Sequence, residues 1–426
     1  MQQHPQRAAL HNEVHARPPQ ALAAPLAISH LVMVCDVAER EASRAHIAAL
    51  LHDLHLPLPD PQASHFRMDL GQFHIRWELH TEFVSWTFMC ALASERPGEV
   101  KPEPEPAFKA VPQNWLAALP GQCLSSLNLW VTPSPTFGAS ALIKQLLLED
   151  SLLASRVAGG AAEVYTDFSM RSDGSSRMLL LTGNLSPRRL GRLVQRLLEI
   201  ETYRMAALLG LPAAREASAI LASAELELAE LASAIRSATA QDEPLLLDRL
   251  TKLAGQVESQ HAATHSRFSA SAAYFELVDK RISDIDEAAL PGMQTIGEFM
   301  DRRLSPARST CAWATRRQDA LSQRVSRISN LLRTRVEIEQ QQSSQALLAT
   351  MNSRQHMQLK LQSTVEGLSV AAITYYIVGL ISYLAKAGHS VGWPWSAEST
   401  AALARPVVAL AVWWSLRRLH HRVFKD

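Results

Sequence analysis

The sequence is poor in cysteine and has no surplus of either charge. Its four cysteines lie far apart and form no C-x-x-C pair, which argues against a disulfide framework or a zinc site; they are Cys35, Cys90, Cys123 and Cys311. Lysine and arginine number 42 against 41 acidic residues, so the net charge of +1 gives no general attraction to nucleic acid. We therefore expect reduced, buried thiols and no nucleic-acid partner.

The sequence also lacks the short motifs of common enzyme classes. It contains no Walker loop, dinucleotide-binding fingerprint, G-x-S-x-G elbow or kinase signature, so we predict neither an enzyme nor a bound cofactor. The first ten residues lack the apolar stretch of a secretory signal, so nothing would export this end of the chain. The bulk of the protein is therefore expected in the cytoplasm.

Two long apolar runs are present near the C-terminus. The first, residues 367–387, has no charged residue before Lys386 and is about long enough to cross a hydrocarbon core of roughly 30 Å. The second, residues 399–416, is interrupted by Arg405 but is otherwise apolar. The loop between them, residues 388–398, carries two tryptophans, a residue type typical of the membrane–water boundary. The sequence predicts a transmembrane hairpin; two buried helices of a soluble protein are the alternative.

Basic residues flank this hairpin at both ends. Arg354 and Lys360 precede the first run, and residues 417–426 form a basic tail. The positive-inside rule then places both termini in the cytoplasm and the loop in the periplasm. We expect a multi-pass protein of the bacterial inner membrane, with the lipid bilayer as its partner.

One side of the first run is small or polar. Ser369, Tyr376, Gly379 and Tyr383 recur close to one face of a helix. In lipid such a face packs against another helix or lines a water-filled path. We favour helix packing in a homo-oligomer, and a pore is the alternative.

The middle of the chain has the pattern of long helices. We predict a helical domain over residues 186–304, starting at Ser186-Pro187, interrupted near Gly210, and ending with a short helix over residues 294–304. Ser305-Pro306 supplies an N-cap and a first-turn proline for a stalk helix over residues 305–366, which should continue into the first span. Within this stalk the spacing is typical of a coiled-coil seam at Leu321, Val325, Ile328 and Leu332.

The N-terminal domain, residues 1–185, shows an alternating period instead. Apolar residues alternate with polar ones over residues 73–79 and again over 84–90, which is the pattern of half-buried strands. Further strands are predicted at 30–35, 123–131, 164–170 and 177–182, and helices at 39–54 and 140–157. The fold class is therefore α+β: an α/β domain with a mainly antiparallel sheet, a long-helix stalk and a transmembrane hairpin.

Several long phrases carry a family resemblance. They are Asn12-Glu-Val-His-Ala-Arg-Pro18, Val194-Gln-Arg-Leu-Leu-Glu-Ile-Glu-Thr-Tyr-Arg204, Leu331-Leu-Arg-Thr-Arg335, and Gln362-Ser-Thr-Val-Glu-Gly-Leu-Ser369 together with Tyr375-Tyr376. Over essentially the whole chain the sequence resembles the bacterial family of predicted membrane-anchored proteins known as domain of unknown function 3422. The resemblance implies a membrane anchor and no particular activity.

A looser similarity is architectural. A cytoplasmic α/β domain, a long stalk helix, a short outer loop and a basic tail resemble the two-span divalent-cation transporters of the CorA type. The Gly-Met-Asn signature that ends the first span of those transporters is missing here. Ion selectivity therefore does not follow from the resemblance.

One histidine pair has the spacing of a metal site. His11 and His15 stand four residues apart with Glu13 between them, but the pattern is not H-E-x-x-H and no third ligand is predictable. A structural role, in which Glu13 and Arg17 pair with the sheet, is the favoured interpretation. His80-Thr-Glu82, at a strand turn, is the segment that could join them in space.

The leading interpretation is a homo-oligomeric inner-membrane protein whose large cytoplasmic part is a structural, sensory or interaction module with an unknown ligand. A CorA-like ion channel or transporter is the alternative, and a metal-dependent enzyme centred on His11, Glu13 and His15 is the second alternative.

Overall fold

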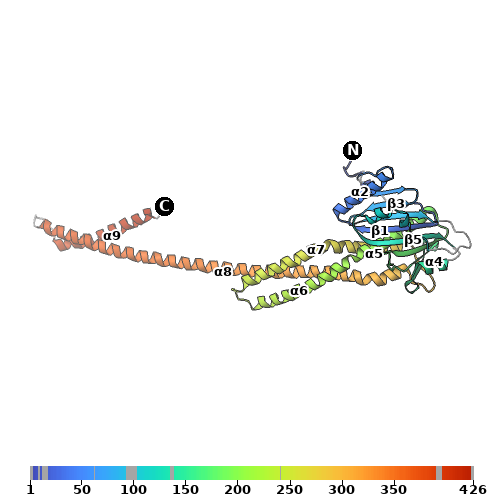
Figure 1. The fold of residues 1–426 in the computed structure, drawn as a ribbon. Coiled ribbons are helices and arrows are strands. Elements are labelled where there is room, and N and C mark those ends of the chain that lie inside the picture. The colour runs from blue at the N-terminus through green and yellow to red at the C-terminus, as the bar shows by residue number, and fades with distance from the viewer. Residues whose placement is uncertain are drawn as a thin grey trace. The chain divides into compact units, whose positions relative to one another are not determined.

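The computed structural model describes residues 3–7, 10–11, 18–61, 63–92, 103–134, 139–239, 241–389 and 396–423. The chain is α+β, with a mainly antiparallel sheet in its N-terminal part followed by long helices and a helical C-terminal region (Figure 1). It divides into two compact units. The first comprises residues 1–236 and 248–328, and the second comprises residues 237–247 and 329–426.

The first unit is built on one sheet, whose described strands have the order β2-β3-β4-β1-β5-β8-β7-β6-β9. Every pair is antiparallel except β5 with β8, so the expectation of a mainly antiparallel sheet is confirmed. The strands are β1 (Leu26–Val34), β2 (His65–Asp69), β3 (His74–Leu79), β4 (Phe83–Ala91), β5 (Gln122–Pro133), β6 (Leu153–Val157), β7 (Ala162–Thr166), β8 (Ser176–Thr182) and β9 (Ala288–Ala289).

Helices cover both faces of the sheet. On one face, α2 (Val37–Asp53) and α4 (Ala139–Leu146) pack on a core that contains Trp77, Trp86 and Trp130. The short helices α3 (Gln113–Ala117), η1 (Ala107–Ala110) and η2 (Glu149–Ser151) lie in the connections of this half. On the other face, α5 (Pro187–Leu208) packs on Ile28 and Leu129. Because both faces are covered, β4 is buried almost throughout instead of alternating.

The remaining helices are much longer. They are α6 (Gly210–Ser237), α7 (Glu243–Asp284), α8 (Ile296–His389) and α9 (Ala397–Val423). Within the first unit, α8 is tied to α6 by Arg317, whose Nη2 lies 2.5 Å from Glu225 Oε2. It is tied to α7 by Gln318, whose Nε2 donates to Thr264 Oγ1 at 2.8 Å.

The start of α8 corrects one expectation. The helix begins at Ile296, so the separate helix over 294–304 and the stalk expected from Ser305-Pro306 are one element with Pro306 inside it. The physical reason is an earlier cap: Glu298 N donates to Thr295 Oγ1 at 3.1 Å, and Thr295 N donates to the Glu298 carboxylate at 3.1 Å. Ser305 is not a cap, because its hydroxyl donates to Asp301 within the helix.

Two further boundaries differ from the sequence prediction. The helix expected over 140–157 ends at Leu146, and β6 follows at Leu153 because it pairs with β7 and β9. The α7 helix ends at Asp284, short of Leu290, since residues 288–289 extend to form β9. Sheet pairing between distant segments therefore overrides the local helical pattern in both places.

The expected coiled-coil seam is buried within this one chain. In the first unit Leu321 and Val325 are 1% and 2% exposed, and in the second unit Leu332 is 1% exposed, whereas Ile328 is only partly buried. The apolar stripe of α8 therefore has partners in its own chain over these residues. It is not a free surface for a second copy.

Two helical stretches among the described residues are long and apolar enough to cross a membrane. Pro187–Ser237 has a window of mean hydropathy 1.3 that is 33% buried, and Ile296–Gly388 has one of 1.8 that is only 11% buried. Core helices of soluble proteins pass the same test, and the first stretch joins α5 to α6, where Ala207, Ala214 and Leu221 are buried. The helix α9, which contains the second expected span, does not reach this threshold.

Candidate functional site

A buried histidine lies between the sheet and α5. His30 on β1 is 5% exposed, and its two ring nitrogens lie 2.9 Å from Thr87 Oγ1 and 3.0 Å from Thr202 Oγ1. Because the Thr202 hydroxyl donates to the Leu198 carbonyl, it accepts from His30 Nε2, and Nδ1 accepts from Thr87. Burial, with Arg76 and His80 nearby, lowers the pKa of His30 to about 3, so the ring is neutral.

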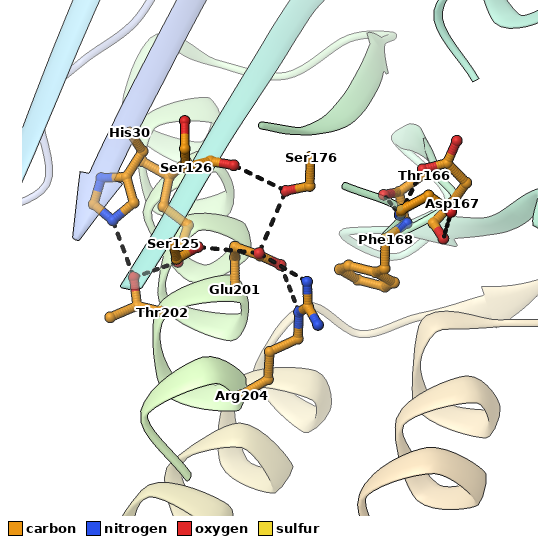
Figure 2. Close-up of polar contacts among 12 residues, drawn as sticks. His30, Ser125, Ser126, Thr166, Asp167, Phe168, Ser176, Glu201, Thr202 and Arg204 are labelled. Carbon is orange, nitrogen blue, oxygen red and sulfur yellow. Dashed lines mark hydrogen bonds and ion pairs between the residues drawn. The ribbon is translucent and has the colours of Figure 1, made fainter. Parts of the chain in front are cut away.

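A buried carboxylate lies one residue before Thr202. Glu201 is 2% exposed and accepts two hydrogen bonds from Arg204, from Nε at 2.6 Å and from Nη2 at 2.8 Å. It also accepts from the hydroxyls of Ser125 on β5 and Ser176 on β8, as Figure 2 shows. The Arg204 guanidinium lies 4.8 Å from the centre of the Phe168 ring. This cluster joins α5 to the centre of the sheet, and its satisfied geometry points to a structural role.

A cavity of about 290 Å³ lies beside His30. Its walls come from three sources: strands β1, β3 and β4, the helix α5, and one residue of α7. Charged and polar side chains dominate the lining, among them Arg76, Glu78, His80, Gln195, Glu199 and Arg281. It is a concave polar site of small-ligand size on a rigid scaffold.

Two ion pairs face this cavity. On β3, Arg76 Nη2 lies 2.6 Å from Glu78 Oε1, and both side chains are largely buried, with exposed fractions of 13% and 11%. On the helical side, Arg281 of α7 pairs with Glu199 of α5 and also lies 3.1 Å from Asp284. The cavity therefore carries a positive and a negative side chain on its sheet side, and again on its helical side.

The turn between β3 and β4 contributes to the lining of the site. His80 lines the cavity and stacks on Phe83 with ring centres 4.4 Å apart. Glu82 pairs with Arg267 of α7 at 2.7 Å. The pKa of Tyr274 is raised above its ordinary value, mainly by burial and also by the nearby Glu82 carboxylate. Residues 80–82, which were expected to lie near the His11–Arg17 motif, are thus bound to α7 through Glu82.

The predicted metal motif falls largely outside the described residues. His11 is described and exposed, whereas Glu13, His15 and Arg17 lie outside the part of the chain that the structure describes. Among the described residues, no group of three or more His, Cys, Asp or Glu side chains is arranged to hold a metal ion. The metal-site hypothesis therefore gains no support here and stays a prediction.

The residues of the predicted pore or packing face all lie on α8. Tyr376 and Tyr383 are 72% and 77% exposed, while Ser369 and Gly379 are partly buried. No atom lies within 4 Å of a Cβ built on Gly379. The two tyrosines of this face are therefore open in a single chain.

The cysteines are free thiols, as expected, but they are not all buried. Cys35 and Cys311 are buried, Cys90 is partly buried and Cys123 is exposed. Burial raises the pKa of Cys35 to about 11. Cys123 corrects the expectation because it lies at the start of β5, where the strand is still at the edge of the core.

Sequence reasoning missed the cavity, although a signal for it was present. In the phrase Val194–Arg204, polar residues recur at helical spacing on a face that also carries core leucines, and Gln195, Leu198, Glu199, Thr202 and Tyr203 line the cavity. The phrase Leu331–Arg335 also has a local role in the second unit: Arg335 Nε lies 2.5 Å from Glu243 Oε1, and the Glu243 side chain is 1% exposed.

Fold and site together define an α+β protein with a small polar cavity between a sheet and a helix. The chain belongs to the family described as Protein of unknown function (DUF3422), whose model matches residues 2–423. Searches among curated proteins and among solved structures found no match.

Proposed function

We propose that the protein is a membrane-anchored, homo-oligomeric protein of the bacterial inner membrane whose large cytoplasmic part is a structural, sensory or interaction module. The apolar surface near the end of α8 carries this proposal. Six large residues there are more than 60% exposed: Leu368, Tyr375, Tyr376, Leu380, Tyr383 and Leu384. A contiguous surface of this kind is unfavourable in water and is covered by lipid in a bilayer.

Residues 403–418 of α9 support the same proposal. Leu403, Val407 and Leu410 are 58%, 66% and 64% exposed, so this helix also presents apolar side chains. Arg417 lies 5.0 Å from the Trp413 ring centre, and Arg418 lies 5.1 Å from that of Trp414. Aromatic residues followed by arginines are typical of the cytoplasmic boundary of a span.

The polar cavity favours the sensory form of the module. A purely structural part needs no cavity lined by largely buried charged groups, because such groups cost free energy to desolvate. Convergent polar groups in a concave site are what fixes the orientation of a bound small ligand.

Membrane residence is tested by alkaline carbonate extraction of bacterial membranes. We expect the full chain to stay with the lipid, and a variant with Ile373→Arg and Leu380→Arg to leave it, since each charge at the centre of a span costs about 2.5–3.5 kcal/mol. The matched control is Leu347→Arg with Leu348→Arg, two exposed residues of the same helix before the apolar run. Complete extraction of the wild-type chain would end the anchor proposal.

Orientation and assembly are tested separately. Reporter fusions at both ends should show cytoplasmic activity, and native mass spectrometry in detergent should show more than one chain. A single mass of one chain at every protein concentration would remove the oligomer from the proposal while leaving the anchor.

A two-span channel or transporter is the second candidate, favoured by the exposure of Tyr376 and Tyr383 on an apolar helix. It predicts ion flux in proteoliposomes that changes in Tyr376→Leu or Tyr383→Leu. Absence of flux for every ion tried would reject this candidate.

A further inference from the structure

We propose that the cavity between β3, β4 and α5 binds a small zwitterion of the amino-acid class, a molecule with one carboxylate and one ammonium group. The inference rests on the sensory form of the proposed module and names its ligand. Binding by purified protein is independent of membrane residence, so the two proposals can fail separately.

The size of the cavity sets the first limit. Its volume of about 290 Å³ equals that of about ten water molecules in the liquid, at roughly 30 Å³ each. This space suits a ligand of about ten non-hydrogen atoms.

Arg76 supplies the carboxylate-binding half of the site. Its side chain is 13% exposed and makes one hydrogen bond, from Nη2 to Glu78. A guanidinium has five N–H donors, so most of them meet no acceptor among the described residues. Arg76 lines the main cavity and also the small neighbouring one, which shares Thr87 and Gln195 with it. A ligand carboxylate would complete a two-pronged pair with this guanidinium.

Glu78 and Gln195 supply the ammonium-binding half. The second carboxylate oxygen of Glu78 has no donor among the described residues, and this side chain is 11% exposed. Gln195 Nε2 donates to Glu199 Oε1 at 2.9 Å, which leaves Gln195 Oε1 buried without a partner. An ammonium group has three donors and no acceptor, which matches two unused oxygens.

The charge balance selects a zwitterion over a simple ion. Arg76 and Arg281, the two arginines of the lining, are matched there by two carboxylates, Glu78 and Glu199, and the buried His30 ring is neutral. A lone anion or cation would leave an unbalanced charge in a partly enclosed space, which a zwitterion avoids. Leu198 and Phe83 add an apolar patch for a ligand side chain.

The test is isothermal titration of the full-length protein, purified in detergent, with each common L-amino acid. Acetate and ethylammonium serve as single-group probes, and glycerol serves as an uncharged probe of similar size. We expect at least one amino acid to bind at one molecule per chain, and every single-group probe to bind at least tenfold more weakly. Absence of binding by all amino acids, or stronger binding of glycerol, would overturn the proposal.

The variant Arg76→Gln with Glu78→Gln removes both charges while keeping the shape of the pair, and should weaken binding at least tenfold. The matched control is Glu225→Gln with Arg317→Gln, an ion pair of the same kind between α6 and α8, which should bind as the wild type does. Gln195→Leu, which removes the unpartnered acceptor together with the hydrogen bond to Glu199, provides a milder second test and should also weaken binding. Unchanged affinity in both cavity variants would place the ligand elsewhere and reject the site.

Discussion

Replacing Glu201 by alanine should destabilise the first unit more than any surface change. The substitution removes the only acceptor that the described residues show for the Arg204 side chain, and Arg204 is 14% exposed. It also leaves the hydroxyls of Ser125 and Ser176 without this carboxylate. Breaking a buried pair by removing one partner costs about 3–5 kcal/mol, because the remaining charge stays desolvated.

The measurement is urea unfolding of the full chain in mild detergent, followed by tryptophan fluorescence. Trp77, Trp86 and Trp130 are at most 1% exposed, so their emission reports on the sheet that Glu201 holds. Asp248→Ala is the matched control, since Asp248 pairs with Lys252 at 2.7 Å one helical turn away with both side chains more than half exposed. An exposed pair of this kind is worth about 0.3–0.5 kcal/mol.

The comparison of Glu201→Ala with its control tests whether the buried ion pair holds α5 on the sheet. If Glu201→Ala costs no more than the Asp248→Ala control, the buried pair does not hold α5 on the sheet. A second variant separates charge from packing: Glu201→Met with Arg204→Met removes both charges and should cost less than Glu201→Ala alone, since no orphan charge remains.

The buried His30 and the turn residue Gly121 should both affect stability. The folded-state pKa of His30, about 3, lies below the 6.5 of an unfolded histidine, so the unfolded chain takes up this proton first as the pH falls. The stability that the neutral His30 contributes is therefore complete above pH 6.5 and is lost toward pH 3. The free energy of unfolding should fall by about 2 kcal/mol between pH 7 and pH 5 because of this group. In urea titrations at these two pH values, His30→Gln should remove this part of the pH dependence. Gly121→Ala should lower the free energy of unfolding by about 2 kcal/mol or more, because φ is +92° and the new Cβ would lie 2.5 Å from the Val34 carbonyl oxygen. Gly71→Ala is the control: φ is +83° but no atom lies within 4 Å of the new Cβ, so it should cost only about 1 kcal/mol. Equal costs for the two glycines would contradict the steric argument.

Sequence patterns predicted most of the secondary structure because local physics determines it. Ser186-Pro187 does start α5, and the alternating residues of 73–79 and 84–90 do form β3 and β4. The failures occur where distant segments decide. Residues 153–157 look helical but pair as β6, and β2 was not predicted at all, since its pattern is short and its partner is β3.

The candidate site was less predictable for the same reason. Arg76 and Arg281 are about two hundred residues apart, and nothing in either neighbourhood indicates that they face one cavity. Only the α5 phrase carried a local signal, through Gln195 and Thr202 on a mostly apolar face. The pair on β3 meets the pair between α5 and α7 only in the folded chain, which a single sequence does not reveal.

The polar cavity should lower the stability of the unit that contains it, and this gives a last prediction. Arg76 and Glu78 are largely desolvated, and replacing a buried ion pair by apolar residues of similar volume is often neutral or stabilising by about 1–4 kcal/mol. A structural protein under no functional constraint would lose nothing by that exchange. Arg76→Met with Glu78→Met should therefore unfold at equal or higher urea concentration than the wild type, and it should bind no amino acid. Loss of stability by more than about 2 kcal/mol would instead show that the pair holds the sheet together, and the cavity would then be a by-product of that role.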